Sequence, residues 1–186
     1  MKKLIFTLSF VLCVVFAASA QRNYNSAIGL RFGYPLSITY KQFISEPGAF
    51  EIFGGFRGYS YYSWFSVGAL YEHHNAIASV EGLNWYFGGG ASVFFWTFDN
   101  GFAYGDASTT SIGIMGALGL DYKFPNAPFN LSVDWVPTFF VNGYGNGFAG
   151  GYGALAARYV LEVIHIFHKK GLPEYSGKPF LLYPIL

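Results

Sequence analysis

Large apolar residues recur at every second position in several segments of the chain. The pattern is clearest in residues 26–34, 112–122 and 129–139, where Gly, Ala, Ser or single charged residues occupy the alternate positions. In the first segment the apolar positions are Ile28, Leu30, Phe32 and Tyr34. Successive side chains of a β-strand point to opposite faces, so a period of two predicts strands with one apolar and one small or polar face.

Turn residues divide the chain into eight expected strands. They cover residues 26–34, 36–44, 49–57, 62–73, 80–95, 111–123, 129–140 and 150–161. Short connections are expected around residues 46–48, 74–75 and 125–128, whereas 96–110 and 142–149 are expected to form longer loops. Alternation of short turns with longer loops is typical of an up-and-down barrel in an outer membrane.

Ionisable residues are few and fall on the small, polar face of the expected strands. They are Arg31, Lys41, Glu51, Glu72, Asp121, Asp134 and Arg158. A soluble β-sandwich would carry many charges on its outer face. We therefore predict an all-β, eight-stranded antiparallel transmembrane up-and-down β-barrel, with its apolar face toward lipid and these charges in the lumen. Tyr and Trp are expected at the two headgroup levels.

Residues 1–20 have the layout of a secretory signal peptide. Lys2 and Lys3 precede an apolar run that ends in Ala18-Ser19-Ala20, and the single cysteine, Cys13, falls within this run. We expect a barrel domain over residues 21–161 and a C-terminal periplasmic extension over residues 162–186, which contains three prolines.

Composition narrows the class of protein further. The 186 residues are 53% hydrophobic, 22% aromatic and 11% charged, with a formal net charge of +1. This balance excludes a disordered chain and gives no basic surface for nucleic acid. The part of the chain after residue 20 has no uninterrupted apolar stretch of 18 residues, which argues against a polytopic helical membrane protein.

With these residues in view, the chain resembles the small outer-membrane β-barrel domain proteins, the group of OmpX-like and OmpW-like barrels, in a Gly- and Tyr-rich form typical of Bacteroidetes-type bacteria. The likeness lies in IGLRFGYPLSITYKQF (28–43), GALYEHH (68–74), LNWYFGGGA (83–91), IMGALGLDYKFPNAPFNLSVDWVPTF (114–139) and GALAARYVL (153–161). The resemblance implies a location in the bacterial outer membrane, contact with its lipid and with the barrel-assembly machinery, and no established activity for most members. It departs after Leu161, because 25 residues follow where such barrels usually end in a terminal aromatic residue.

The predicted lumen charges are the strongest candidates for a functional site. Buried charges must pair, so we expect a salt-bridge network that fills a lumen only wide enough for its own side chains. The expected role is therefore non-enzymatic, either structural or through a ligand bound by the outer loops. The alternative is a narrow channel or carrier for small solutes.

No catalytic, cofactor-binding or metal-binding set is predicted. His73 and His74 are adjacent in the sequence, so on a strand they would point to opposite faces and could not bind one metal. They fall near an expected periplasmic turn, and His165 and His168 lie in the extension. Gly88-Gly89-Gly90 lacks the Lys and Ser or Thr of a phosphate loop and is expected to relieve crowding or curve a strand.

Overall fold

The computed structural model describes residues 24–98, 107–143 and 146–161, so the expected signal peptide and C-terminal extension lie outside the described residues. Ten strand segments are present: β1 (Ser26–Gly33), β2 (Leu36–Phe43), β3 (Gly48–Gly58), β4 (Tyr62–Ala76), β5 (Leu83–Phe98), β6 (Ala107–Lys123), β7 (Phe129–Trp135), β8 (Thr138–Phe140), β9 (Gly147–Ala149) and β10 (Gly153–Leu161). No described residues form a helix long and apolar enough to span a membrane.

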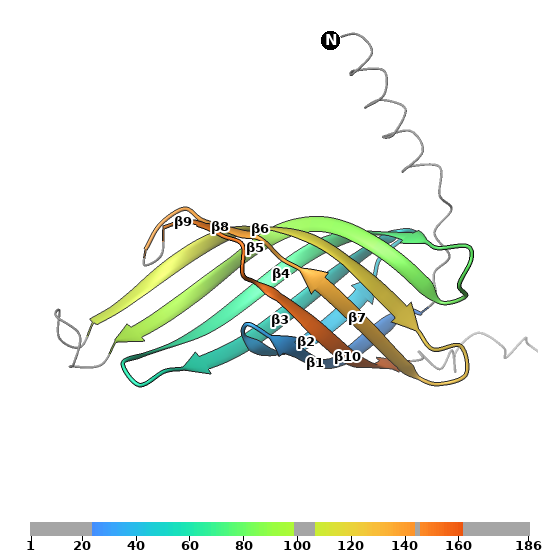
Figure 1. Ribbon diagram of the computed structural model, residues 1–186, viewed down its shortest axis with the longest axis horizontal. Helices are drawn as coiled ribbons and strands as arrows, with labels where there is room; N and C mark the ends of the chain where they lie inside the picture. The colour runs from blue at the N-terminus through green and yellow to red at the C-terminus, as the bar shows by residue number, and fades with distance from the viewer. Residues whose placement is uncertain (1–23, 99–106, 144–145, 162–186) are drawn as a thin grey trace, which may run out of the picture.

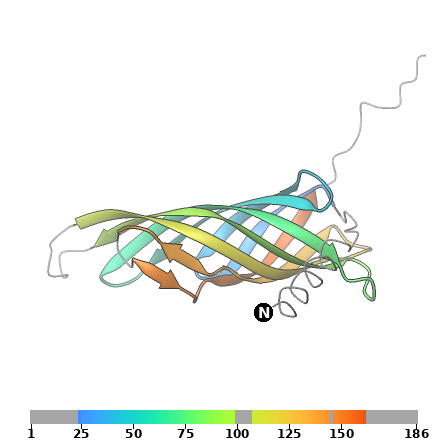
Figure 2. The ribbon, with the colours of Figure 1, turned by 90° about the horizontal axis from the view of Figure 1, so that it is seen from above.

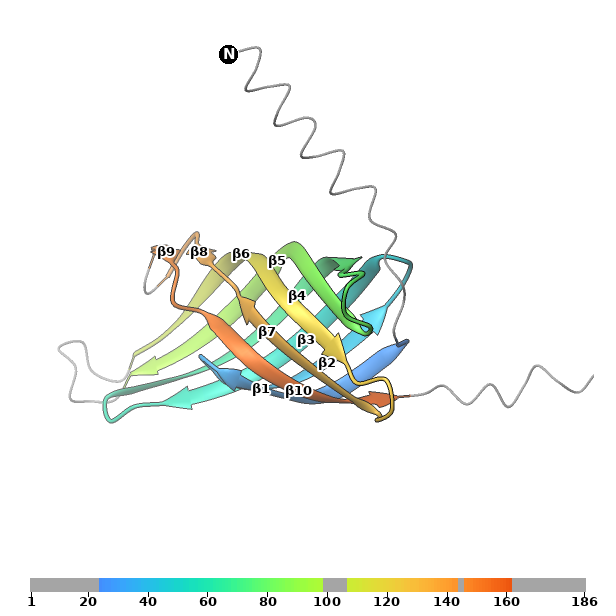
Figure 3. The same ribbon diagram turned by 45° about the vertical axis from the view of Figure 1, so that its right-hand side comes forward.

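The strands close on themselves. All pairings are antiparallel, β1 pairs with both β2 and β10, and β5 pairs with both β4 and β6. Both β7 and β8 pair with β6, and they are two halves of one barrel strand; β9 and β10 form the last one in the same way. The predicted fold class is confirmed: the chain forms an eight-stranded antiparallel barrel, whose tilted strands are seen in Figure 3.

Pro137 explains why the seventh barrel strand is divided. Proline has no N–H to donate to a neighbouring strand, so it interrupts the ladder between β7 and β8. The interruption is bridged on both sides, because Gly116 donates to the carbonyl of Pro137 and Val136 donates to the carbonyl of Tyr152. The wall of the barrel therefore bends here without separating.

Three expected connections differ from the structure. The expected loop over residues 96–110 is wrong at both ends, because β5 continues to Phe98 and β6 begins at Ala107. Aromatic residues of β5 there pair with Thr and Ser of β6, a combination that favours strands. The segment 142–149 includes β9. His74 and Asn75 lie inside β4, not in a turn, because these polar residues face the barrel interior.

The wall is uneven in height. β1 and β2 have 8 residues each, whereas β4, β5 and β6 have 15, 16 and 17. In Figures 1 and 2, β5 and β6 reach well past the turn between β1 and β2, at the end away from the described termini. β1 begins and β10 ends at the same rim of the barrel. At the opposite rim the long strands β5 and β6 project beyond the turn between β1 and β2.

Outside, the barrel presents a broad apolar surface. Large hydrophobic side chains on most strands are more than a third exposed, with Ile38 at 64% and Phe56 at 61%. Aromatic side chains gather outside near the rim that holds the described termini, where Phe50 packs on Tyr71 and Phe129 packs on Tyr159. An outward apolar surface with aromatic side chains near a rim matches the lipid-facing surface of a membrane barrel.

Candidate functional site in the barrel interior

All seven ionisable residues singled out in the sequence point into the barrel. They come from seven different strands, and none is more than 8% exposed. The period-two alternation of each strand places its charge on the inner face, and the pairing register sets Lys41 directly opposite Glu51. We call Arg31, Lys41, Glu51, Glu72, Asp121, Asp134 and Arg158 the charged layer.

Glu51 on β3 is the centre of the charged layer because three cations reach its carboxylate. Arg31 Nη1 lies 2.8 Å and Arg158 Nη2 lies 2.6 Å from Glu51 Oε1, while Lys41 Nζ lies 3.3 Å from Oε2. The Thr39 hydroxyl also donates to Oε1. One carboxylate thereby holds side chains from three other strands in place.

Lys41 on β2 extends these contacts across the lumen. Its Nζ lies 2.7 Å from Glu72 Oε2 and 3.4 Å from Asp121 Oδ2. It also lies 4.6 Å from the centre of the Tyr86 ring, within the range of a cation–π contact. On the other side, Arg31 Nη2 lies 2.8 Å from Asp134 Oδ1. The ion pairs therefore join all seven residues into one network.

Uncharged and aromatic residues complete the hydrogen bonds of this network, and the sequence analysis did not single them out. Tyr86 donates to Asp134 at 2.9 Å, Asn130 donates to Asp121 at 2.8 Å, and Arg158 donates to Ser132 at 2.7 Å. Tyr24, which precedes β1, donates to Asp121. For Asn130 and Ser132 the signal was present, because they share the inward phase of Asp134 on β7.

His74 also belongs to the interior and contacts the charged layer. Its Nε2 lies 2.8 Å from Glu72 Oε2, and its ring stacks on Tyr86 with centroids 4.9 Å apart. Its Nδ1 has no hydrogen-bond partner in the described chain. A serine-type catalytic arrangement would need a hydroxyl on one ring nitrogen and an acid on the other; here only the acid is present. His73 lies on the opposite face of β4, beside Phe87.

Apolar clusters lie above and below the charged layer, and one of them corrects an expectation. Near the rim of the described termini, Tyr24, Phe43 and Val160 pack together. At the far rim, Trp64, Phe94, Trp96 and Phe140 form a buried cluster that we call the aromatic plug. The aromatic residues therefore do not all face outward, because the tall part of the barrel encloses more space than Gly, Ala and Ser can fill.

A small pocket lies inside the described part of the barrel. Between the charged layer and the aromatic plug, the interior retains a cavity of about 30 Å³ beside Arg31, Phe53 and Met115. The interior is thus closed by ion pairs at one level and by aromatic rings at another.

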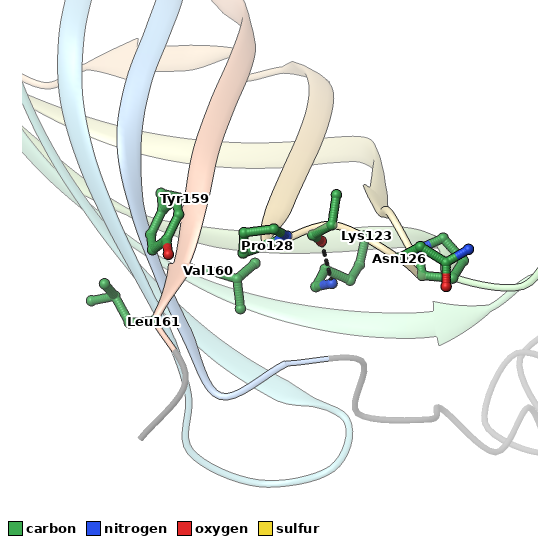
Figure 4. Close-up of a pocket in the computed structure, with 8 residues that line it drawn as sticks. Lys123, Asn126, Pro128, Tyr159, Val160 and Leu161 are labelled. Atoms are coloured by element: carbon green, nitrogen blue, oxygen red, sulfur yellow. Dashed lines mark hydrogen bonds between the residues drawn. The ribbon is translucent and has the colours of Figure 1, made fainter. Parts of the chain in front are cut away.

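A second, larger hollow lies on the rim near the described C-terminal end. It has a volume of about 630 Å³ and lies between the turn after β6 and the end of β10, next to Lys123, Pro128 and Leu161 (Figure 4). The Lys123 ammonium group donates to the carbonyl oxygens of Phe124 and Ala127, at 2.6 and 2.8 Å. Its charge therefore serves to hold the turn.

Neither interior nor rim offers metal ligands in the described ranges, where no group of three His, Cys, Asp or Glu side chains could hold a metal ion.

Comparisons with known proteins give one structural similarity. No protein-family model and no curated protein matches the sequence. The solved structure of Neisserial surface protein A (NspA) is similar to this chain with a TM-score of 0.46 and 16% sequence identity, over 73% of this chain and 93% of that one.

Proposed function

We propose that this protein is a barrel of the bacterial outer membrane that has no enzymatic activity and acts as a structural or surface-interaction element. The outward apolar belt supports a position in lipid, because a closed barrel satisfies its backbone hydrogen bonds internally and leaves no edge strand in the hydrocarbon. An N-terminal export signal fits the same location. The tall strands β4, β5 and β6 then project from the cell surface.

The filled interior of the barrel is the observation that supports a non-conducting role. The charged layer spans the lumen with its cations and acids in contact, and the aromatic plug closes the tall end. A conducting pore needs a continuous polar path, and the ion pairs of the charged layer and the packed rings of the aromatic plug oppose such a path at two levels. What remains available for function is the outer surface and the loops.

Single-channel recording in planar lipid bilayers tests this role. We expect the purified barrel to insert without regular current steps. Regular steps from the wild-type protein, changed in size by Arg31→Gln or Glu51→Gln, would establish the alternative, a narrow channel or carrier for small solutes. Insertion is verified independently by faster gel migration of the unheated protein than of the heated protein and by its presence in the outer-membrane fraction.

Partners follow from the same location. We propose outer-membrane lipid around the barrel, the barrel-assembly machinery during insertion, and an extracellular ligand contacted by the outer loops.

Incubation with labelled outer-membrane lipid examines the competing enzymatic role: a product that is lost in His74→Gln would overturn the non-enzymatic proposal.

A further inference from the structure

Four side chains form a compact group at the rim opposite the described termini, which we call the rim cluster: Tyr34, Arg57, Tyr59 and Tyr62. The Arg57 guanidinium lies 4.5 Å from the centre of the Tyr34 ring and 5.2 Å from that of Tyr59. The Tyr59 and Tyr62 rings stack with centroids 4.8 Å apart and planes inclined by 27°. Arg57 is the last residue of β3 at a position that faces the barrel interior, and Tyr34 lies in the turn between β1 and β2.

The hydroxyl groups fix this geometry. Arg57 Nε donates to the Tyr59 hydroxyl at 2.9 Å, and that hydroxyl donates to the Tyr34 hydroxyl at 3.2 Å. Tyr34 is anchored from below, since its ring packs on Trp64 of the aromatic plug at 5.6 Å. The rim cluster is therefore preorganised on a rigid base.

Arg57 differs from the other cations of the described chain. The three lumen cations contact carboxylates, and Lys123 donates to two turn carbonyls. Arg57 donates only through Nε, to a tyrosine, and no carboxylate in the described residues pairs with it. Among the described residues its terminal N–H groups have no hydrogen-bond acceptor, and they have the fork geometry that matches the oxygens of a phosphate.

The low wall sets the height of the rim cluster. Eight residues of tilted strand rise about 20 Å, and β1 and β2 have 8 residues each. The apolar band of a membrane barrel is about 25 Å tall, so the turn that holds Tyr34 lies close to the headgroups of the outer leaflet. On the outer face beside it, Phe32, Leu36 and Phe56 are 52%, 54% and 61% exposed.

We propose that the rim cluster binds the phosphorylated sugar headgroup of an outer-leaflet glycolipid. The Arg57 guanidinium pairs with the phosphate, and the tyrosine rings and hydroxyls contact the sugar, which presents both apolar C–H faces and hydroxyl groups. The acyl chains lie along Phe32, Leu36 and Phe56. This inference rests on the proposed location in the outer membrane, which supplies the lipid and sets the height of the rim.

Titration of the purified full chain in detergent micelles tests the inference, with bound lipid counted by native mass spectrometry. The probes are rough-type lipopolysaccharide that carries its phosphates and the same lipid after enzymatic dephosphorylation. We expect Arg57→Gln to weaken binding of the phosphorylated lipid by about tenfold or more, which is the scale of a charge-assisted hydrogen-bonded pair. Tyr59→Phe, which keeps the ring and removes the acceptor of Arg57 Nε, is expected to weaken it less.

Lys123→Gln is the matched control, because it removes one cation from the opposite rim. Equal binding by wild type and Arg57→Gln, or equal binding of phosphorylated and dephosphorylated lipid, would overturn the inference. Equal affinity for glucosamine 6-phosphate in solution would also overturn it, in favour of a soluble sugar phosphate. Failure of the proposed location gives a different result: the unheated protein would then migrate like the heated protein and be absent from the outer-membrane fraction.

Discussion

The charged layer and the aromatic plug close two levels of one barrel in different ways. In the charged layer, each side chain is held by directed contacts, and Glu51 alone receives three cations. In the aromatic plug, rings pack at varied angles, from 17° between Phe94 and Trp96 to 80° between Phe94 and Phe140. The comparison teaches that the charged layer depends on every member keeping its partner, whereas the plug depends on filled volume.

Removal of the central carboxylate is expected to have the largest effect. Glu51→Gln keeps the shape of the side chain but leaves Arg31, Lys41 and Arg158 buried without its charge. We expect the free energy of unfolding in lipid vesicles, measured in urea by tryptophan fluorescence, to fall by about 4 kcal/mol. Glu81→Gln, in an exposed turn, serves as the control. A loss below about 1 kcal/mol for Glu51→Gln would show that the charged layer tolerates an unpaired member.

Truncation in the aromatic plug is expected to cost somewhat less and to leave the lumen closed. Trp64 is 1% exposed and contacts Tyr34, Phe94 and Trp96. Trp64→Ala should lower the free energy of unfolding by about 3 kcal/mol, because a cavity replaces the ring. Planar-bilayer recordings should still show no current steps, since the charged layer remains intact. Phe148→Ala, at a side chain that is 69% exposed, is the control. Steps in Trp64→Ala would mean that the plug alone closes the barrel.

The tight packing between Gly119 and Tyr86 offers a sharper comparison. A Cβ on Gly119 would come within 2.6 Å of Tyr86 Cζ and 2.7 Å of the Val133 carbonyl oxygen. Because the backbone oxygen cannot move independently of its strand, Gly119→Ala should lower the free energy of unfolding by about 2 kcal/mol in the same urea assay. Gly151→Ala adds a methyl group in open space and should change it little. Equal stability of the two variants would contradict a tight fit around Tyr86.

The sequence predicted the charged layer better than the plug for a physical reason. A charge fixes the phase of a strand, because one face of a membrane barrel meets lipid. Followed along β4, the phase of Glu72 also points Trp64 inward, a signal that the sequence analysis did not use. In β5, residues 83–98 contain no charge, and both faces carry aromatic rings. Which rings of β5 enter the lumen is therefore decided only by closure of the barrel.

The hydroxyl of Tyr86, which bonds to the charged layer, carries the smallest of these effects. Tyr86 donates to Asp134 Oδ2 at 2.9 Å, while its ring contacts Lys41 and His74. Tyr86→Phe keeps the ring and removes only this hydrogen bond to a buried carboxylate. We expect the free energy of unfolding to fall by about 1.5 kcal/mol.

Tyr122→Phe is the matched control for that change, since the Tyr122 ring packs on Phe124 and its hydroxyl donates no hydrogen bond in the described chain. It should leave the stability within about 0.5 kcal/mol of wild type. If the two variants lost equal stability, the hydroxyl of Tyr86 would add nothing to the charged layer, and its ring alone would join the ion pairs to the apolar interior. A loss confined to Tyr86→Phe would show that directed contacts extend beyond the charged residues to this aromatic side chain.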